Sequence, residues 1–561
     1  MAEDLGTTFA TRGDQMFLRF SEEELARLAR FGEPRRFHAG DYLVRRGEVG
    51  PGLMIILSGQ VEATQPNGAQ TTHIVTHERG NFMGELAQLS GRPYLVDEKA
   101  LTDVEAIAIS PDRLRALLVA EANLGEQLMR ALILRRVGLI ESGAGPIVIG
   151  DEHNPDVLRL TNFLRRNGHP YRSLDPSNDT CAQTLVERFE VAPEELPIVL
   201  CPGGQILRNP TDFQLGRCVG LVGPIDAERL YDLVVIGAGP SGLATSVYAG
   251  SEGLSVLTID CRSFGGQAGA SSRIENYLGF PTGISGMALM GRAFSQAQKF
   301  GVEMAIPDEA VNLECSSNPF RLQLGTGERI QSRAVVIATG ARYRRLDVDR
   351  LEEFEGASVH YWASPLEGDL CANSDVALVG GGNSAGQATV YLAGRARHVT
   401  MMARRPLQDT MSQYLIERIE ALPNVEVVIG CEISGLKGSN GQLEAIACRN
   451  RQSGNETRRA VRYLFSFIGA EPNTDWLRSS GITLDERGFV LTGDELGADR
   501  LPLETSRRGV FAVGDVRSTS VKRVAASVGD GAQAVAAVHK YLATEQPAQP
   551  MLVQQAVVTT V

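Results

Sequence analysis

The chain lacks a Cys-x-x-Cys pair, a long apolar run and an excess of basic residues. Its 561 residues include eight cysteines, and the closest of them in sequence are 17 positions apart. This spacing excludes a Cys-x-x-Cys redox motif and a zinc site built from closely spaced cysteines. We expect the scattered cysteines to be small, buried apolar residues, as is usual in a cytoplasmic protein.

No apolar run approaches the ~18 residues that would span a bilayer, so we expect no membrane partner. The first ten residues, MAEDLGTTFA, contain two acids and no basic segment, which does not match a secretory signal and favours a cytoplasmic location. The 55 Lys and Arg residues against 67 Asp and Glu residues give a net charge of −12. We therefore do not expect nucleic acid to be the main partner.

Glycine, by contrast, is abundant. The chain contains 60 glycines, more than one residue in ten, where about 7% is average. Such an excess suggests tight turns that hold phosphate groups. At about 150 residues per domain, the length predicts three or four domains.

Short apolar or alternating runs in the first 140 residues predict a β-barrel followed by a long helix. The predicted strands are residues 41–45, 52–57, 60–64, 73–76 and 104–109. The pairs Ser58-Gly59 and Asn67-Gly68 predict hairpin turns. Ser110 is the expected N-cap of the helix, whose apolar positions continue to Leu139.

Three stretches of this block resemble the cyclic nucleotide-binding domain family: FHAGDYLVRRGEV (37–49), LSGQVE (57–62) and GNFMGELA (80–87). In that family the third stretch opens the helix that binds the cyclic phosphate. The resemblance implies a possible pocket formed by Gly84, Glu85, Leu86, Ala87 and Arg92, in which Glu85 takes the ribose hydroxyl.

One residue departs from that family in a way that matters for binding. Tyr94 stands where the family has the arginine that pairs with the phosphate, and Asp97 adds negative charge nearby. Arg92 precedes a proline and points elsewhere if the backbone is unchanged. We expect weak or no cyclic-nucleotide binding, with the domain kept as a module for docking or dimer formation.

The second block, residues 145–222, alternates strands and helices. Strands are predicted at 146–150, 171–174, 196–201 and 205–208, and helices at 157–167 and 182–189. This order resembles a thioredoxin or glutaredoxin module, with Pro197 at the position of the family's cis-proline. The family's thiols would follow the first strand, where this chain has Asp-Glu-His-Asn-Pro (151–155), so we expect no redox activity. A generic α/β spacer is the alternative, and His153 is expected to be a surface residue.

The third block opens with a strand, a glycine-rich turn and a helix. Residues 232–236 are followed at once by Gly237-Ala-Gly-Pro-Ser-Gly242 and a helix over 243–250. In this context a G-x-G-x-x-G turn binds a dinucleotide pyrophosphate. The next strand ends in Asp260, whose carboxylate would accept hydrogen bonds from a ribose diol and repel a 2′-phosphate.

A second copy of this pattern begins at residue 375. Its turn is Gly380-Gly-Gly-Asn-Ser-Ala385, and its second strand, 398–402, is followed by Ala403, Arg404 and Arg405. Guanidinium groups match phosphate oxygens, so this copy favours NADPH over NADH. The first copy suits FAD. A solvated arginine pair is the alternative for Arg404 and Arg405.

The two turns, an Ala-Thr-Gly strand end (338–340) and a late Gly514-Asp515 together resemble the low-molecular-mass thioredoxin reductase family over residues 231–542. The resemblance implies two sets of cofactor-binding residues. The FAD set is Gly237, Gly239, Pro240, Ser241, Gly242, Asp260, Gly266, Gln267, Asn276, Thr339, Gly340, Gly514, Asp515, Arg523, Val524 and Ala525. The NADPH set is Gly380, Gly382, Asn383, Ser384, Ala385, Arg404 and Arg405.

The redox pair of that family is missing. The family has Tyr-Cys-Ala-Thr-Cys where this chain has Tyr361-Trp362-Ala363-Ser364-Pro365. Trp362 and Pro365 cannot carry out thiol–disulfide exchange, so no catalytic side chain and no metal is assigned.

The leading hypothesis is an NADPH-dependent FAD oxidoreductase that passes electrons directly to a small-molecule or redox-protein acceptor: oxygen, a quinone, a ferredoxin or a small disulfide. The N-terminal domain is a candidate regulator, and the resemblance implies a homodimer. Two alternatives stay open. One is a thioredoxin-disulfide reductase with thiols from Cys371 or a partner chain, and the other is a non-enzymatic nucleotide or redox sensor.

The predicted fold class is a multidomain chain with a β-barrel plus helices, a thioredoxin-like α/β module and two Rossmann-like α/β domains. The expected boundaries are 1–140 for the cyclic-nucleotide-binding-like domain and 145–222 for the thioredoxin-like module. Residues 228–345 with 469–545 form the FAD domain, 346–468 the NADPH domain and 546–561 a loosely ordered or subunit-crossing tail.

Overall fold

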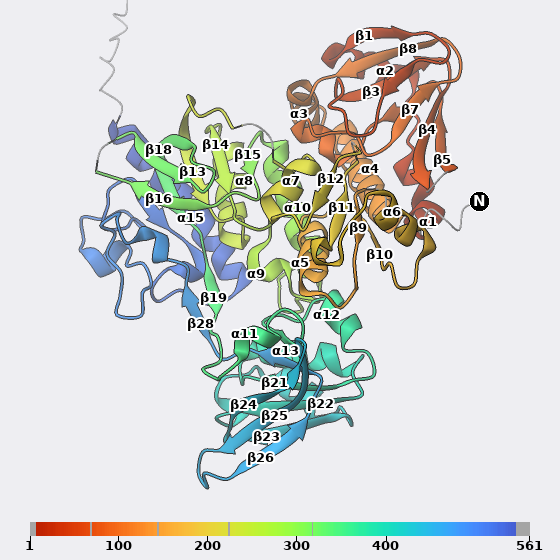
Figure 1. Cartoon of the computed structure of the whole chain (residues 1–561). Helices are drawn as coiled ribbons and strands as arrows, with labels where there is room; N and C mark the ends of the chain where they lie inside the picture. Colours follow the sequence, from red (N-terminus) through yellow and green to blue (C-terminus); the bar gives the residue numbers. More distant parts are fainter. Residues whose placement is uncertain are drawn as a thin grey trace, which may run out of the picture.

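The structure is a computed structural model that describes residues 7–67, 70–142, 145–202, 204–222, 225–316 and 318–545. Figure 1 shows four units: an N-terminal unit (7–142), a middle unit (145–222), a first α/β unit (225–343 with 470–545) and a second α/β unit (344–469). The expected tail, 546–561, lies outside the described residues.

The N-terminal unit is built from two four-stranded antiparallel sheets, with strand orders β1-β8-β3-β6 and β2-β7-β4-β5. The strands are β1 (Glu33–Phe37), β2 (Tyr42–Val44), β3 (Leu53–Ser58), β4 (Val61–Asn67), β5 (Gln70–His77), β6 (Phe82–Met83), β7 (Asp97–Ala100) and β8 (Val104–Ile109). Helices α1 (Thr7–Met16) and α2 (Glu22–Leu28) precede the sheets, and α3 (Pro111–Ala120) and α4 (Ala122–Glu141) follow them. Apolar residues from both sheets share one core, which closes the barrel.

Two expectations for this unit are wrong. The Ser58-Gly59 pair does not close a hairpin, because β3 pairs with β6 and β8 whereas β4 pairs with β5 and β7. The predicted long helix is two helices, since Glu121 leaves helical geometry at φ −110° and ψ 76°. Its carboxylate binds Arg27 and Arg30 at this break, so tertiary ion pairs stabilise an interruption that local propensity does not indicate.

The β4–β5 hairpin is present, although residues 68–69 of its turn lie outside the described residues. Ser110 is the N-cap of α3 with Pro111 at the first helical position, which confirms that prediction.

The middle unit is a four-stranded sheet in the order β10-β9-β11-β12. Strands β9 (Ile147–Ile149) and β10 (Arg172–Leu174) are parallel, whereas β11 (Ile198–Leu200) runs antiparallel to β9 and to β12 (Ile206–Arg208). Helices α5 (Pro155–Arg166), α6 (Thr180–Arg188) and α7 (Asp212–Cys218) connect or follow them. The peptide bond before Pro197 is cis, and His153 is exposed.

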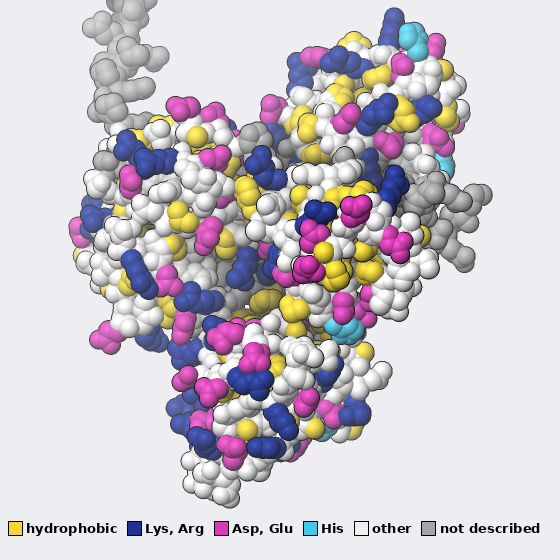
Figure 2. Space-filling view, viewed as in Figure 1, with side chains coloured by type: hydrophobic (Ala, Val, Ile, Leu, Met, Phe, Trp, Pro, Cys, Tyr) yellow, Lys and Arg dark blue, Asp and Glu magenta, His cyan; other side chains and the backbone are white. Residues whose placement is uncertain are grey.

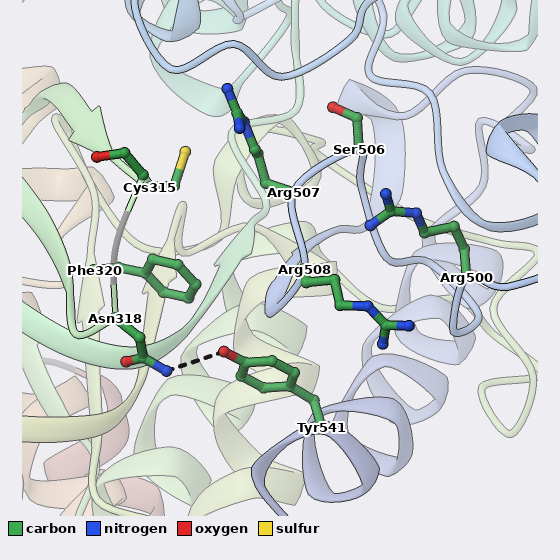
Figure 3. Close-up of a pocket in the computed structure, with 9 residues that line it drawn as sticks. Cys315, Asn318, Phe320, Arg500, Ser506, Arg507, Arg508 and Tyr541 are labelled. Carbon is green, nitrogen blue, oxygen red and sulfur yellow. Dashed lines mark hydrogen bonds between the residues drawn. The ribbon is translucent and has the colours of Figure 1, made fainter. Parts of the chain in front are cut away.

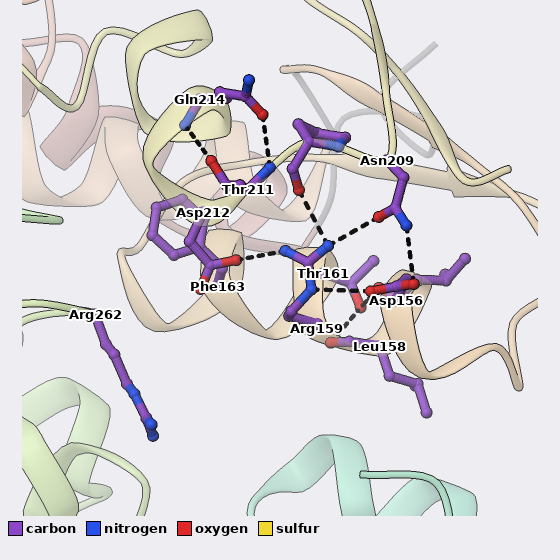
Figure 4. A network of polar contacts seen from close by, with 12 residues as sticks. Asp156, Leu158, Arg159, Thr161, Phe163, Asn209, Thr211, Asp212, Gln214 and Arg262 are labelled. Atoms are coloured by element: carbon purple, nitrogen blue, oxygen red, sulfur yellow. Dashed lines mark hydrogen bonds and ion pairs between the residues drawn. The ribbon is translucent and has the colours of Figure 1, made fainter. Parts of the chain in front are cut away.

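Arg159 on α5 ties this helix to the segment before α7 (Figure 4). Its guanidinium donates hydrogen bonds to Asp156 at 3.1 Å, Asp212 at 2.8 Å and the Asn209 side-chain oxygen at 2.9 Å. The Asn209 amide donates in turn to Asp156 at 3.0 Å. This charged network therefore holds the start of α5 to the start of α7 and the loop before it. Helix α5 directly follows segment 151–155, which contains no thiol.

A disulfide also crosses the middle unit, which corrects the expectation for two cysteines. Cys201, after β11, is bonded to Cys218, the last residue of α7, with their Cα atoms 5.9 Å apart. Folding of the β11–β12 hairpin against α7 brings together residues that are distant in sequence. Cys181 and Cys261 are exposed rather than buried, whereas Cys315, Cys371, Cys431 and Cys448 are buried as expected.

The first α/β unit contains a seven-stranded mixed sheet. Its strands are β13 (Leu230–Ile236), β14 (Val256–Ile259), β15 (Glu303–Ala305), β16 (Ala310–Glu314), β17 (Phe320–Leu324), β18 (Arg329–Ile337) and β29 (Val510–Ala512). The order is β15-β14-β13-β18-β17-β16, with β29 parallel to β18. The helices are α8 (Pro240–Ser251), α9 (Gly266–Gly269), α10 (Gly286–Lys299) and α15 (Val524–Glu545).

The apolar run of β13 is explained by burial on both faces of this sheet. Leu233 and Val235 pack with residues of α8 and α15, whereas Val234 and Ile236 pack into the opposite core. A parallel strand that is covered on both sides needs apolar side chains at every position.

The second α/β unit contains a parallel five-stranded sheet in the order β20-β27-β21-β22-β23 and an antiparallel sheet in the order β24-β25-β26. The strands are β20 (Val359–His360), β21 (Asp375–Val379), β22 (His398–Ala403), β23 (Val425–Ile429), β24 (Cys431–Ser439), β25 (Gln442–Asn450), β26 (Glu456–Ala460) and β27 (Tyr463–Ser466). The helices are α11 (Leu351–Phe354), α12 (Pro365–Leu370), α13 (Asn383–Ala393) and α14 (Gln413–Glu420). The antiparallel strands β19 (Ala341–Tyr343) and β28 (Ala470–Pro472) link this unit to the first α/β unit.

No helix in the described ranges is long and apolar enough to cross a membrane. The same residues contain no group of three or more His, Cys, Asp or Glu side chains that could hold a metal ion. On the face shown in Figure 2, basic and acidic side chains are interspersed over all four units.

Candidate functional site

The first glycine turn follows β13 and leads into α8. Gly237 has φ +112°, a conformation that favours glycine, and a Cβ on Gly242 would overlap the Gly237 carbonyl oxygen, because α8 packs directly on the turn. Gly239, the N-cap of α8, is different, since a Cβ there would meet only the Gly266 Cα at 3.9 Å. The space before the helix N-terminus therefore fits a pyrophosphate, which the first N–H groups of α8, including that of Ser241 after Pro240, would face.

Asp260 lies beside this turn at the end of β14. Its Oδ2 accepts the N–H of Ala238 at 2.9 Å, and its Oδ1 accepts the N–H groups of Arg262 at 2.9 Å and Ser263 at 3.1 Å. Three backbone donors thus fix a carboxylate at the position that a nucleotide ribose needs. This geometry fits the adenosine half of FAD.

The other FAD candidates follow the neighbouring strands β18 and β29. Thr339 and Asn473 exchange two hydrogen bonds of 2.9 Å, which joins the end of β18 to the loop after β28. Gly514 follows β29 with φ +71°. Burial raises the pKa of Asp515, and the nearby Lys522 opposes the shift.

The remaining FAD candidates lie around the same edge. Gly340 has φ +64°, the Gln267 side chain donates to the Ala341 carbonyl, and Asn276 is exposed. Arg523 directly precedes α15, and Val524 and Ala525 begin this helix. The structure therefore brings the ends of β13, β18 and β29 together at one edge of the sheet, where nucleotides bind in such folds.

The second glycine turn repeats the arrangement of the first in the second α/β unit. Gly380 has φ +150°, and Ala385, fully buried, takes the position of the third glycine. Gly382 is the N-cap of α13, and a Cβ on it would meet nothing within 4 Å. The Asn383 side chain accepts the N–H of Ser412 at 2.7 Å. The open N-terminus of α13 fits a second pyrophosphate.

Arg404 and Arg405 directly follow β22 and are both exposed. Within the described chain neither guanidinium is engaged in an ion pair or a side-chain hydrogen bond. Asp260 follows the last residue of β14 that pairs with β13, and Ala403 follows the last residue of β22 that pairs with β21. Ala403 is therefore the counterpart of Asp260, and Arg404 lies one position further along the chain. Both arginines are therefore free to meet a 2′-phosphate.

Tyr343 lies between the two nucleotide-binding regions, a role that the sequence did not reveal. Burial raises its pKa, while a hydrogen bond from Ser384 of the second turn opposes the shift. The negative charge of Asp515 also acts on it, and its ring packs edge-on against Phe467 at 5.4 Å. Tyr343 thus lies beside Ser384 of the second turn and within reach of the charge of Asp515.

The segment that stands where the family has its redox cysteines forms the N-terminal cap of α12. Glu367 is 3% exposed, and its carboxylate accepts hydrogen bonds from the Trp362 indole N–H at 2.9 Å and the Ser364 backbone N–H at 3.0 Å. The Ser364 hydroxyl also donates to it. Pro365 begins α12. Trp362 is therefore held in place by an acid that has no part in thiol chemistry.

The middle unit reaches this position through Arg166 at the end of α5. Its Nη2 donates to the Gly266 carbonyl at 2.9 Å, and its guanidinium lies 5.9 Å from the centre of the Trp362 ring. Burial lowers the pKa of Arg166, while the charges of Asp260 and Glu367 oppose the shift. One arginine of the middle unit thus contacts both α/β units, which sequence spacing alone does not indicate.

Cys371 is poorly suited to replace the missing pair. It is fully buried in the core of the second α/β unit. Burial raises its pKa, with the charge of Glu367 adding to the shift, which keeps the thiol protonated.

The candidate cyclic-nucleotide pocket in the N-terminal unit is largely filled by the protein's own side chains. Only about 40 Å³ remains. Arg135 of α4 enters it and donates to the carbonyls of Phe82 at 3.0 Å and Gly84 at 2.9 Å. Tyr94, 1% exposed, donates its hydroxyl to the Gly52 carbonyl. Side chains therefore occupy the volume that a ligand would need.

The two acids at this pocket carry little free negative charge, because Glu85 is in an ion pair and the raised pKa of Glu98 keeps it mostly protonated at neutral pH. Glu85 is 5% exposed and pairs with Arg136 of α4 at 3.2 Å. Burial raises the pKa of Glu98, a second acid at the pocket, to about 8. Leu86 and Ala87 begin a short 3-10 helix (Leu86–Ser90). Arg92 lies 5.9 Å from the Phe294 ring on α10 of the first α/β unit, so it points away from the pocket.

We expect cyclic AMP and cyclic GMP to show no binding in the micromolar range by titration calorimetry. Tyr94 stands where the family has the arginine that pairs with the phosphate, which removes about 1.5–3 kcal/mol of a charge-assisted contact, and Arg135 already donates to two carbonyls. Tyr94→Arg is the matched variant. It should not restore binding while Arg135 and Glu98 occupy the pocket, and micromolar binding by the parent protein would refute this reading.

Known protein families match both the two α/β units and the N-terminal unit. The pyridine nucleotide-disulphide oxidoreductase family model matches residues 231–533, just over half of the chain, and the cyclic nucleotide-binding domain family model matches residues 34–121. The chain is 31% identical to the thioredoxin reductase of Bacillus subtilis over 317 residues, covering 56% of this chain and 96% of that protein.

Two further relatives extend this comparison. The NADH dehydrogenase of Bacillus subtilis is 30% identical over 480 residues, covering 83% of each chain. The crystal structure of Lactococcus lactis thioredoxin reductase in its FR conformation superposes with a TM-score of 0.52 at 28% identity, covering 56% of this chain and 99% of that one. The chain therefore belongs to the pyridine nucleotide-disulphide oxidoreductase family, whose thioredoxin-reductase-like members are FAD-dependent oxidoreductases that use NADPH.

Proposed function

We propose that this chain is an NADPH-dependent FAD oxidoreductase that reduces an acceptor from outside the chain without an internal dithiol. The observation that carries this proposal is the Trp362–Glu367 helix cap, which stands where the family has its redox cysteines. When bound, FAD takes two electrons from the nicotinamide and passes them to the acceptor.

The chain's own residues hold and orient the two nucleotides. The turn from Gly237 to Gly242 would bind the FAD pyrophosphate, and Asp260 its ribose. The turn from Gly380 to Ala385 would bind the NADPH pyrophosphate, with Arg404 and Arg405 on the 2′-phosphate. Trp362, fixed by Glu367, would limit access at the place where thiols stand in the family.

The same evidence disfavours a thioredoxin-disulfide reductase that uses Cys371, because that thiol is fully buried and kept protonated. The Cys201–Cys218 disulfide is another internal group that could accept electrons. A non-enzymatic sensor would bind both nucleotides without turnover, so measurements of turnover distinguish it from an enzyme.

The middle unit is proposed to be a thioredoxin-like module. Its strand order β10-β9-β11-β12, with one parallel pair followed by an antiparallel hairpin, supports this assignment. An experimental structure with another strand order would overturn it. In this proposal the unit braces the Gly266 loop through Arg166, and its Cys201–Cys218 disulfide is structural.

The division of the chain at residues 140, 145, 222, 345 and 468 is likewise a proposal. It is supported by the separate sheets and by the β19–β28 link, at which the chain enters and leaves the second α/β unit. The N-terminal unit would influence the flavoenzyme through its packing on α10 rather than through a cyclic nucleotide.

Rapid mixing of the NADPH-reduced protein with a panel of acceptors tests the proposed function. We expect oxygen, quinones or a ferredoxin to reoxidise the protein, and thioredoxin to leave it reduced. Fast reoxidation by thioredoxin would favour the disulfide reductase, and absence of reduction by NADPH would favour a sensor.

A further inference from the structure

A pocket of about 280 Å³ lies in the first α/β unit (Figure 3), and none of its lining residues belongs to either glycine turn. It is lined by Cys315, Ser316, Asn318, Phe320, Arg500, Ser506, Arg507, Arg508 and Tyr541. Phe320 begins β17 and pairs with Ser332 near the start of β18, and Arg508 precedes β29. The parallel strands β18 and β29 run from this side of the sheet to Thr339 and Gly514 at their other ends, so the pocket and the FAD site lie at opposite edges of the sheet.

Helix α15 runs from the FAD site to the pocket, so its length gives the distance between the two sites. Val524, a candidate FAD residue, begins this helix, and Tyr541 lines the pocket near its other end. With a rise of 1.5 Å per residue, the two positions are about 25 Å apart along the helix axis. The pocket is therefore distinct from the flavin site.

Three guanidinium groups meet at this pocket without acidic partners. Among the described residues, none of Arg500, Arg507 and Arg508 forms an ion pair. Arg500 is partly buried, and its Nη1 is enclosed without a hydrogen-bond partner. Arg508 donates only to the Asp499 carbonyl, at 3.5 Å. An enclosed guanidinium without an acid beside it is unfavourable, and an anion held by the exposed Arg507 and Arg508 would offset its charge.

The acids close to the pocket are already engaged. Glu504 is fully buried, and its two oxygens accept the N–H groups of Gly509 at 3.0 Å and Leu501 at 3.2 Å. Glu545 accepts a hydrogen bond from Asn318 at 2.9 Å. Neither acid forms an ion pair with the three arginines, so the positive charge of the pocket stays uncompensated.

The walls of the pocket are fixed by local packing. The Asn318 amide also donates to the Tyr541 hydroxyl at 3.1 Å, which positions the ring opposite the arginines (Figure 3). Gly481, with φ +67°, leaves room for the Arg507 guanidinium, which a Cβ at that position would overlap. Phe320 and Tyr541 add aromatic surface for the carbon part of a ligand.

We propose that this pocket binds a compact organic polyanion, whose phosphate or carboxylate oxygens are held by Arg500, Arg507 and Arg508. Guanidinium forks match both groups bidentately. The volume of about 280 Å³ lies just below the range for small-molecule sites, about 300–1,000 Å³, which favours a compact ligand. The site does not depend on the proposed redox function.

Titration calorimetry on the FAD-bound protein tests this site, with inorganic pyrophosphate in one arm and citrate in the other. Saturating NADP⁺ in both arms occupies the second glycine turn and the proposed 2′-phosphate site, which removes both as competing binders. We expect saturable binding of one of the two anions at low ionic strength. Arg507→Ala/Arg508→Ala and Arg500→Ala should each weaken that binding at least tenfold.

Arg321→Ala is the matched control, because Arg321 is an exposed arginine next to Phe320 that does not line the pocket. Its affinity should stay within twofold of the parent. If Arg500→Ala does not fold, the double variant of two exposed arginines decides. The proposal is overturned if neither anion binds, or if binding survives in Arg507→Ala/Arg508→Ala.

Discussion

Under anaerobic conditions, one equivalent of NADPH per FAD will fully reduce this protein, and thioredoxin will not be turned over. In the thioredoxin reductase family a dithiol beside the flavin consumes a second equivalent. Here Trp362 and Pro365 replace both cysteines, and neither side chain can exchange with a disulfide. The measurement is a spectral titration of FAD, followed by admission of air and then by a thioredoxin turnover assay.

Two cysteine variants serve as controls for this titration, because each removes one internal sulfur group that could take up electrons. Cys371→Ser should leave the endpoint at one equivalent, because the buried, protonated thiol is not a redox partner. Cys201→Ser/Cys218→Ser should also leave it unchanged if the disulfide is structural. A parent endpoint of two equivalents would contradict the prediction, and the variant that restores one equivalent would identify the group responsible.

A gain-of-function variant sharpens the same test. Trp362→Cys/Pro365→Cys restores the two thiol positions of the family, at the expense of the indole hydrogen bond to Glu367. It should raise the endpoint to two equivalents if the missing thiols alone prevent the dithiol relay. An endpoint that stays at one equivalent would show that the second α/β unit also holds this segment out of reach of the flavin.

The strand–turn–helix geometry of the two glycine turns could be predicted from the sequence because it is local. Gly237 and Gly380 each follow an apolar strand directly, and the structure gives both a left-handed backbone conformation that glycine favours. Strand, turn and helix are contiguous there, so no long-range contact is needed to identify them. The same holds for the N-cap and first residue of α3, Ser110 and Pro111.

The features that could not be predicted depend on residues distant in sequence. Arg166 meets the Gly266 carbonyl across 100 positions, and Glu121 interrupts a helical pattern because it binds Arg27 and Arg30, more than 90 positions away. Cys201 and Cys218 do not form a motif by spacing and are joined only once α7 folds back. Tertiary contacts decide such cases, and local propensity carries no signal of them.

The chain will use NADPH in strong preference to NADH, and Arg404→Ala/Arg405→Ala will abolish most of that preference. Two charge-assisted contacts to the 2′-phosphate contribute roughly 2–4 kcal/mol. Their loss corresponds to a fall of roughly 30- to 900-fold in the ratio of kcat/KM for NADPH to kcat/KM for NADH. The observed geometry supports this, since both arginines are exposed at the end of β22 without acidic partners.

The effect of the variant on each coenzyme's kinetics shows whether the two arginines bind the 2′-phosphate. If the arginines bind the 2′-phosphate, the variant should lose NADPH efficiency through KM and keep its NADH kinetics, because NADH never met those guanidinium groups. Arg458→Ala, at an exposed arginine in β26 of the same unit, controls for a general change in charge and should leave the ratio unaltered. Equal use of both coenzymes by the parent protein would refute the assignment. A variant that weakens NADPH and NADH alike would show that the arginines support the fold of the turn rather than select the phosphate.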